Sequence, residues 1–254
     1  MAWQHLRVES DEVVTRITLD RPEVRNALSQ ALMEELTAAL RSATGRVVVI
    51  AGAGPCFSAG HDLAELVAGD TAAHARLFEV CADLMEAVTT IDQPVIAEVH
   101  GVATAAGCQL VAACDLAVAE EGARFATPGV RIGLFCSTPM VPVTRAIGPK
   151  RAMQMLLTGD FVDAATARDW GLVNEVVPAG ELQAAVRHLA ERIAEASPLV
   201  LAMGKRAFHR HLGLDPRRAT DLASAVMVAN AGTNDAREGM QAFLDKRRPT
   251  WTGT

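Results

Sequence analysis

The sequence predicts an α/β protein whose last part is entirely helical. Short apolar segments rich in Val and Ile alternate with longer segments whose apolar residues recur every three or four positions, which is the pattern of buried strands separated by helices. Strand-like segments almost stop after Pro149, whereas helical patterns continue to residue 247. With 254 residues, half of them apolar, the chain is long enough to bury a large core.

Residues 13–51 form the first strand–helix–strand unit of this prediction. Residues 13–19 are rich in β-branched side chains and are followed by an Arg-Pro pair, so we expect a strand that runs into a loop. Asn26 or Ser29 can cap the next helix, whose apolar positions recur every four residues at Leu32, Leu36 and Leu40. Residues 46–51 are an apolar run before a Gly-Ala-Gly-Pro turn, which predicts a second, buried strand.

The same alternation continues through the middle of the chain. It predicts a helix at 72–91, a strand at 94–99, a helix of small residues at 105–113 and a strand at 116–119. Apolar strands that are separated by helices favour parallel pairing, because each helix provides the crossover between neighbouring strands.

The C-terminal part is predicted to be helical. Residues 172–177 are the last expected strand, and helices are expected at 163–170, 179–196, 198–211, 216–230 and 233–247. We divide the chain into a core at 1–196 and a helical region at 197–254. Because no Ser/Pro-rich linker separates them, we expect the helical region to pack on the core or on a neighbouring subunit.

Composition excludes several classes of function. The net charge of −6 comes from interspersed acids and bases, so no basic face is available for nucleic acid. The N-terminus lacks the features of a signal peptide, and the apolar run 99–118 carries His100, Gln109 and Asp115, so we expect a cytosolic protein without a membrane span. Five cysteines, an odd number without a C-x-x-C pair, indicate reduced thiols and no zinc site.

Two turns that follow predicted strands are suited to hold an anion. The segment 56–63, C-F-S-A-G-H-D-L, has small residues that let the backbone approach a ligand closely. The segment 101–110, G-V-A-T-A-A-G-C-Q-L, opens a helix, where unpaired N–H groups and the helix dipole favour negative charge. Two such donors that face each other would form an oxyanion hole, although either segment alone is more often an ordinary tight turn.

Five motifs occur along the chain in an order that is typical of one family. They are F-S-A-G-H-D-L at 57–63, the helix start at 101–110, C-D-L-A-V-A at 114–119, F-A-T-P at 125–128 and F-L-D-K-R-R-P at 243–249. In these motifs the chain resembles the crotonase (enoyl-CoA hydratase/isomerase) superfamily over nearly its whole length. The resemblance implies a spiral core of repeated β-β-α units, a helical trimerisation region, and acyl thioesters of coenzyme A as ligands with no other cofactor.

The resemblance places two oxyanion donors on the main-chain N–H groups of His61 and Ala106. It also places Gln109 and Gly129 where hydratases of the family carry two glutamates. One glutamate deprotonates water and the other exchanges the α-proton of the substrate. An amide can only orient water and glycine can do neither, which argues against ordinary hydration and isomerisation. Changing both residues to glutamate is expected to restore hydration.

Three side chains could replace the missing acid–base groups, and each has a structural alternative. His61 either shuttles protons through its imidazole or only lines the acyl channel, and the second interpretation is favoured. Ser137 lies where some isomerases of the family place an acid, but it is better explained as the cap of a helix that Pro139 opens. Asp62 is expected to cap the helix that begins at Leu63.

The resemblance also implies contacts with coenzyme A. They come from the loop around Arg25, from the segment 59–64, and from the tail of the same chain or of a neighbouring subunit. The complete set is Arg25, Ala27, Ala59, His61, Asp62, Leu63, Ala64, Phe243 and Lys246. Hydratases often carry lysines at the positions of Glu23 and Ala64, so Arg25 is the cation expected to compensate.

Two further polar features have structural interpretations. His209 and His211 are spaced like metal ligands but lack a third partner, so we expect them on the solvated face of a charged helix. Asp115 is expected to be structural, because a buried aspartate must be hydrogen-bonded.

Two functions remain open from the sequence. In the first, the protein is an enzyme of acyl-CoA or fatty-acid metabolism that uses the oxyanion hole for a reaction other than ordinary hydration. In the second, it is a non-catalytic acyl-CoA-binding or regulatory paralogue. The pairing of F-S-A-G-H-D-L with G-L-F-C-S-T-P at 133–139 resembles a divergent branch of the family that lacks both glutamates. The expected assembly is a homotrimer or a dimer of trimers.

Overall fold

A six-stranded sheet forms the centre of the molecule, of which the computed structural model describes residues 3–254. Its strand order is β1-β2-β3-β4-β6-β9, with β1 at Leu6–Ser10, β2 at Val14–Leu19, β3 at Val47–Gly52, β4 at Val95–Val99, β6 at Leu116–Glu120 and β9 at Glu175–Val177. The neighbouring strands from β2 to β9 are parallel, as predicted. The antiparallel β1 was not predicted, because polar residues dominate its sequence LRVES.

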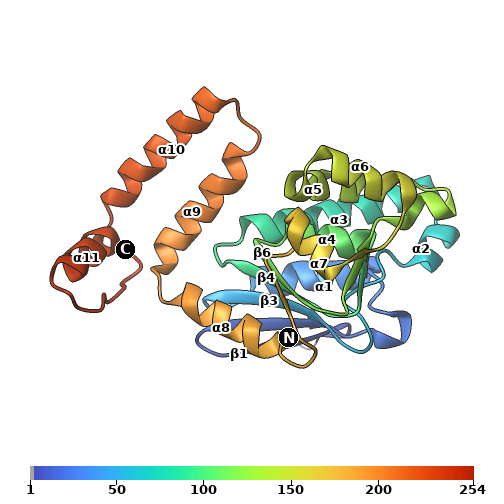
Figure 1. Cartoon of the computed structure of the whole chain (residues 1–254), viewed down its shortest axis with the longest axis horizontal. Coiled ribbons are helices and arrows are strands. Elements are labelled where there is room, and N and C mark those ends of the chain that lie inside the picture. Colours follow the sequence, from blue (N-terminus) through green and yellow to red (C-terminus); the bar gives the residue numbers. More distant parts are fainter. Residues whose placement is uncertain (1–2) are drawn as a thin grey trace.

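Helices cover both faces of this sheet (Figure 1). On one face, α1 (Gln30–Arg41) packs against α3 (Thr71–Thr90). On the other face, α8 (Leu182–Ala194) packs on β3, β4 and β6. The central strands are therefore buried on both sides, which explains their continuous apolar sequences. Ser29 is the cap of α1, because its hydroxyl accepts a hydrogen bond from the Leu32 N–H at 3.3 Å.

A second, three-stranded sheet completes the spiral. Its order is β5-β7-β8, with β5 at Val102–Thr104, β7 at Arg124–Ala126 and β8 at Val162–Asp163. β4 continues through β5 into α4 (Ala106–Ala113), and β6 continues through β7 into the 3-10 helix η2 (Pro128–Ile132). This is the repeated β-β-α arrangement that the resemblance implies. Strands of two or three residues are too short to give a sequence period, so these were missed.

Shorter helices complete the core. α2 (Leu63–Ala68) precedes α3, and α5 (Ser137–Ile147), α6 (Pro149–Thr158) and α7 (Ala164–Trp170) follow η2. Ser137 is the first residue of α5, and its hydroxyl donates to the Phe135 carbonyl at 3.3 Å. The prediction that Ser137 caps a helix opened by Pro139 is therefore wrong, because the helix begins two residues earlier.

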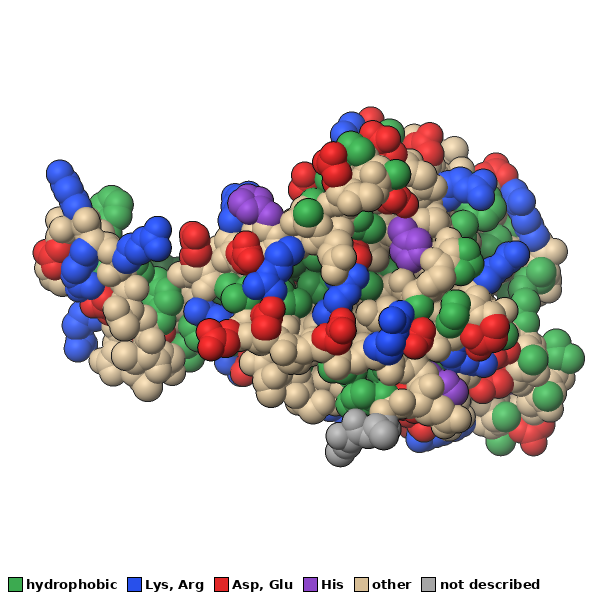
Figure 2. Space-filling model, turned by 90° about the horizontal axis from the view of Figure 1, so that it is seen from below, with side chains coloured by type: hydrophobic (Ala, Val, Ile, Leu, Met, Phe, Trp, Pro, Cys, Tyr) green, Lys and Arg blue, Asp and Glu red, His purple; other side chains and the backbone are tan. Residues whose placement is uncertain are grey.

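The surface carries mixed charge. Figure 2 shows acidic and basic side chains interspersed over one face of the molecule. Among the helices of residues 3–254, none combines the length and the apolar character that a bilayer span requires.

Three helices form an arm that extends away from the core (Figure 1). This arm, residues 197–254, contains α9 (Pro198–His211), α10 (Pro216–Ala231) and α11 (Asn234–Leu244). α9 contacts α3, whereas no residue of α10 is buried. The division of the chain at residue 196 stays a prediction.

A buried cation joins the arm to the core. Lys205 Nζ donates to the carbonyls of Val88 and Gln93 and pairs with the Asp115 carboxylate, each at 2.8 Å. His209 Nε2 lies 2.9 Å from the same carboxylate, so the expectation of a solvated His209 is wrong. Asp115 has the structural role expected of it. No group of three or more potential metal ligands occurs within residues 3–254.

Candidate active site

Two turns of backbone meet at the candidate site, one before α2 and one before α4. Leu28 forms a parallel bridge with His61 in the first turn. Gly60 has a φ of 93°, and a Cβ at this position would lie 2.8 Å from the Ala105 Cβ and 3.3 Å from the Ala106 nitrogen. Glycine alone allows this close approach, so the F-S-A-G-H-D-L motif brings its own backbone against the start of α4.

The main-chain N–H groups of His61 and Ala106 have no acceptor among residues 3–254. Ala106 is the first residue of α4, where N–H groups lack helical partners and the dipole is positive. Ala105, just before it, has a φ of 49° and a ψ of −118°. Such a conformation costs a non-glycine residue about 1–3 kcal/mol and is often found at functional sites. Two unused donors on touching segments are suited to hold a negatively charged oxygen.

Asn26 fixes the first of these turns, a role that sequence reasoning missed. Its buried amide donates to the carbonyls of Ala53 and Cys56 at 2.8 and 2.9 Å. The main-chain carbonyl of Asn26 accepts a hydrogen bond from the Ser58 hydroxyl at 2.8 Å. The φ of Asn26 is 52°, in the left-handed region that asparagine tolerates better than most residues. In the sequence, only the place of Asn26 in the loop after an Arg-Pro pair indicates this turn.

The His61 ring contacts α3. It meets Phe78 edge-on, with ring centroids 5.5 Å apart and an interplanar angle of 86°. Both ring nitrogens are buried, and neither makes a hydrogen bond within residues 3–254. Burial lowers the pKa of His61 from 6.5, and the Leu28 carbonyl opposes this shift only in part. The imidazole is therefore neutral near pH 7, and the packing of its ring against Phe78 favours the interpretation that it lines the site.

Gln109 is buried on α4 and also faces α3. Its Oε1 accepts a weak hydrogen bond from Cys81 Sγ at 4.0 Å. Burial raises the pKa of Cys81 to about 12, so this thiol is protonated at neutral pH. Neither the amide nor the thiol can take a proton from water. Phe78 and Cys81 are one turn apart on α3, so His61 and Gln109 contact neighbouring positions of one helix.

Gly129 lies in η2 and has no room for a side chain. A Cβ at this position would lie 2.6 Å from the Leu134 carbonyl oxygen and 2.8 Å from Cys136 Sγ. The Gly129 N–H donates to Cys136 Sγ at 3.3 Å. Burial raises the pKa of Cys136, an effect that this N–H partly opposes, so the thiol is protonated. The φ of Gly129 is not positive, so the structure requires glycine for space.

Asp62 has the structural role that was expected of it. Its carboxylate accepts a hydrogen bond from the Ala64 N–H at 3.1 Å and thereby caps α2. The same carboxylate pairs with Arg21 at 3.2 Å, and both side chains are mostly buried. The Asp62 carboxylate is therefore bound both by the Ala64 N–H and by the Arg21 guanidinium.

The structure brings together only part of the predicted coenzyme A contacts. Ala59 lies against Arg25, because its N–H donates to the Arg25 carbonyl at 3.0 Å, and the exposed Leu63 and Ala64 begin α2. Ala27 is buried beside them. Phe243 and Lys246 lie at the end of the arm, and Figure 1 shows α11 at the opposite end of the molecule from α2. A single chain therefore does not bring these two residues to the site.

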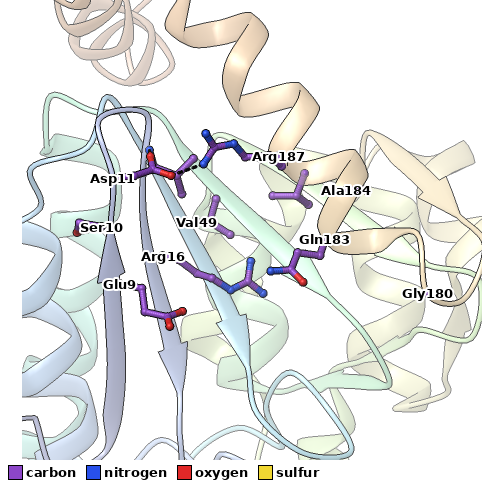
Figure 3. A pocket seen from close by; sticks show the side chains of 11 residues that line it. Glu9, Ser10, Asp11, Arg16, Val49, Gly180, Gln183, Ala184 and Arg187 are labelled. Atoms are coloured by element: carbon purple, nitrogen blue, oxygen red, sulfur yellow. Dashed lines mark hydrogen bonds and ion pairs between the residues drawn. The ribbon is translucent and has the colours of Figure 1, made fainter.

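A cavity of about 590 Å³ lies on the other face of the large sheet, between β1, β2, β3 and α8 (Figure 3). Figure 3 shows Arg187 paired with Asp11 across it. Arg16, which also lines it, is held by the buried Glu98 through hydrogen bonds of 2.5 and 2.6 Å. Neither His61 nor Ala106 lines this cavity, so it takes no part in the candidate site.

Comparison with known proteins finds relatives over nearly the whole chain. Residues 9–254 match the enoyl-CoA hydratase/isomerase family. The mouse mitochondrial "enoyl-CoA hydratase domain-containing protein 3" is 43% identical, and the match covers 94% of this chain and 81% of the mouse protein. Its name places that protein in mitochondria, and the cytosolic location expected for this chain stays a prediction.

Two crystal structures give the same result. An enoyl-CoA hydratase from Mycobacterium smegmatis is 44% identical with a TM-score of 0.95, covering 98% of this chain and 99% of its own. Human enoyl-CoA hydratase domain-containing protein 3 is 42% identical with a TM-score of 0.93, and the match covers 98% of this chain and 100% of the human chain. The crotonase-like fold and the resemblance to this branch are thereby confirmed.

Proposed function

The chain belongs to the enoyl-CoA hydratase/isomerase family, and from this premise we propose that it binds acyl-CoA thioesters at the two turns that meet at Gly60. The N–H groups of His61 and Ala106 hold the thioester oxygen. They are unused by residues 3–254 and lie on segments that touch. In a well-studied protease, one such donor contributes about 3–4 kcal/mol to stabilising an oxyanion.

We also propose that this protein is not an ordinary hydratase. The observation that carries this proposal is the packing of Gly129, where the Leu134 carbonyl and the Cys136 thiol fill the space that a side chain would need. The position that the family uses for a carboxylate therefore cannot hold one without movement of this loop. Gln109, at the other carboxylate position, and the neighbouring Cys81 thiol are both without charge at neutral pH.

Two measurements test the proposal. Calorimetry with butyryl-CoA is expected to show binding, and crotonyl-CoA is expected to be hydrated orders of magnitude more slowly than by a competent hydratase, because each acid–base group contributes typically about 10²–10⁴-fold. Ordinary hydratase turnover in a preparation free of contaminating enzyme would contradict the second part. Absence of binding to every acyl-CoA tested would contradict the first.

The alternative function is a non-catalytic acyl-CoA binder or regulatory paralogue. It is favoured by the packing of the His61 ring on Phe78, which leaves both ring nitrogens buried and without a hydrogen-bond partner within residues 3–254. A turnover screen across acyl-CoAs separates the two functions. Conversion of any acyl-CoA that His61→Phe abolishes would establish the enzyme, whereas binding without conversion supports the paralogue.

The arm supports a further part of the proposal, which is assembly into a homotrimer or a dimer of trimers. α10 buries no residue in the chain, and Met227, Val228, Phe243 and Leu244 of the arm are exposed by 63–84%. Apolar surface of this kind is typical of subunit interfaces. In such an assembly Phe243 and Lys246 would approach the coenzyme A site of a neighbouring subunit.

A further inference from the structure

A second cavity lies where the arm joins the core. It has a volume of about 350 Å³ and is lined by core residues around 44–46 and 92–94, by the first turns of α9 and by Gly253 near the C-terminus. Its lining includes two arginines, Arg46 and Arg206, and one acid, Asp92. None of these residues belongs to the candidate active site.

Arg46 is a partly buried charge that makes no ion pair within residues 3–254. Its Nη2 donates to the Ala196 carbonyl, and its Nε is buried without a hydrogen-bond partner. Buried charges in proteins are normally paired and their N–H groups satisfied. The other arginines of similar burial follow this rule, because Arg16 pairs with Glu98 and Arg21 with Asp62.

The surroundings of Arg46 do not neutralise it. The Asp92 carboxylate is 63% exposed and pairs with Arg206 at 3.4 Å. Pro198 and Leu199 form the start of α9 in the cavity wall, and the Leu199 N–H has no acceptor within residues 3–254. The positive end of the α9 dipole therefore adds to the charge of Arg46.

We propose that this cavity binds a small oxyanion, a phosphate or a carboxylate group, which pairs with Arg46. Arg46 Nη1 makes no hydrogen bond within residues 3–254 and is not among the buried atoms, so it is the donor that remains for the anion, and a charge-assisted hydrogen bond to an oxyanion is strong. The volume suits inorganic phosphate or a small organic acid. The bound anion contacts both the core and α9, so it strengthens the attachment of the arm.

Thermal unfolding of the full chain tests this site. Sodium phosphate and sodium acetate are each titrated against sodium chloride at equal ionic strength. The melting temperature is expected to rise by several degrees and to saturate, because a ligand that binds only the folded state stabilises it. A rise with phosphate alone assigns the site to phosphate, and a rise with acetate assigns it to carboxylates. Arg46→Met should abolish the rise, whereas Arg41→Met, at an exposed arginine of α1, should retain it.

Two results would overturn the proposal. One is an equal response to chloride, and the other is an unchanged saturable rise in a folded Arg46→Met variant. If Arg46→Met does not fold, Arg206→Met provides a second measurement at an exposed residue of the same cavity. Calorimetry should then show weaker phosphate binding, because this variant removes one of the two positive charges in the cavity wall. Unchanged affinity in this variant would equally contradict the proposal.

Discussion

The Cys136 side chain fills the space beside Gly129, and this limits which residues position 129 can accept. Because a Cβ on Gly129 would lie 2.6 Å from a main-chain oxygen and 2.8 Å from Cys136 Sγ, Gly129→Ala is expected to lower the free energy of unfolding by about 1–3 kcal/mol. Gly122→Ala is the matched control, because a Cβ there meets nothing within 4 Å. Urea denaturation of both variants measures the difference. Equal stabilities would show that the loop at 134–136 adapts freely.

The packing around Gly129 argues against the expectation that two glutamates would restore hydration. Gln109→Glu with Gly129→Glu would force the Leu134 carbonyl and Cys136 to move before the new carboxylate could reach a substrate. We therefore expect the double variant to lose stability without gaining hydratase turnover. Measured crotonyl-CoA hydration well above that of the Gln109→Glu variant would show that the loop can accommodate the side chain.

His61 makes stability depend on pH. Its pKa is lowered from 6.5 by burial, so as pH falls below 6.5 the unfolded chain binds a proton that the folded chain does not. The contribution is therefore absent above pH 6.5 and grows as destabilisation below it, to at most about 1.4 kcal/mol at pH 5.5. His61→Phe should remove this part of the stability loss between pH 7.5 and 5.5 in urea titrations. A variant that loses stability as steeply as the wild type would contradict the assignment.

At the scale of elements, the buried ammonium group of Lys205 joins α9 to three acceptors of the core. Lys205→Met would leave Asp115 without this partner, and removal of one member of a buried ion pair typically costs about 3–5 kcal/mol. We expect that loss in chemical denaturation, together with faster amide hydrogen exchange in α9. Arg206→Met, which breaks an exposed pair with Asp92, should change stability by less than about 1 kcal/mol. Similar losses of unfolding free energy in both variants would mean that the buried pair of Lys205 and Asp115 stabilises the protein no more than the exposed pair does.

For the whole molecule, the exposed arm predicts association. Light scattering at micromolar concentration is expected to give the mass of three or six chains, because closed symmetry lets one arm surface serve every subunit. Val228→Asp places a charge on a side chain of α10 that is 76% exposed, and should shift the protein toward monomers. Val67→Asp is a control at a side chain of the core that is 87% exposed. A wild-type monomer would contradict the proposed assembly.

Local sequence patterns determined much of this architecture. Short apolar and β-branched segments predicted β2, β3, β4 and β6, because strands that are buried on both faces are rich in such residues. The four-residue period of α1 and the start of α9 at Pro198 were predicted for the same local reasons. The motifs of the family also predicted the turns at Gly60 and Ala106, which the structure brings into contact.

Tertiary structure decided the contacts between residues far apart in the chain. The bonds of Asn26 to Ala53 and Cys56, and of Lys205 to Asp115, join positions whose sequence neighbourhoods give no sign of each other. The sequence showed that position 129 lacks a carboxylate, but only the packing of Leu134 and Cys136 shows that it has no room for one. The physical reason is that hydrophobic periodicity and turn chemistry act over a few residues, whereas volume and hydrogen-bond partners are shared across the folded chain.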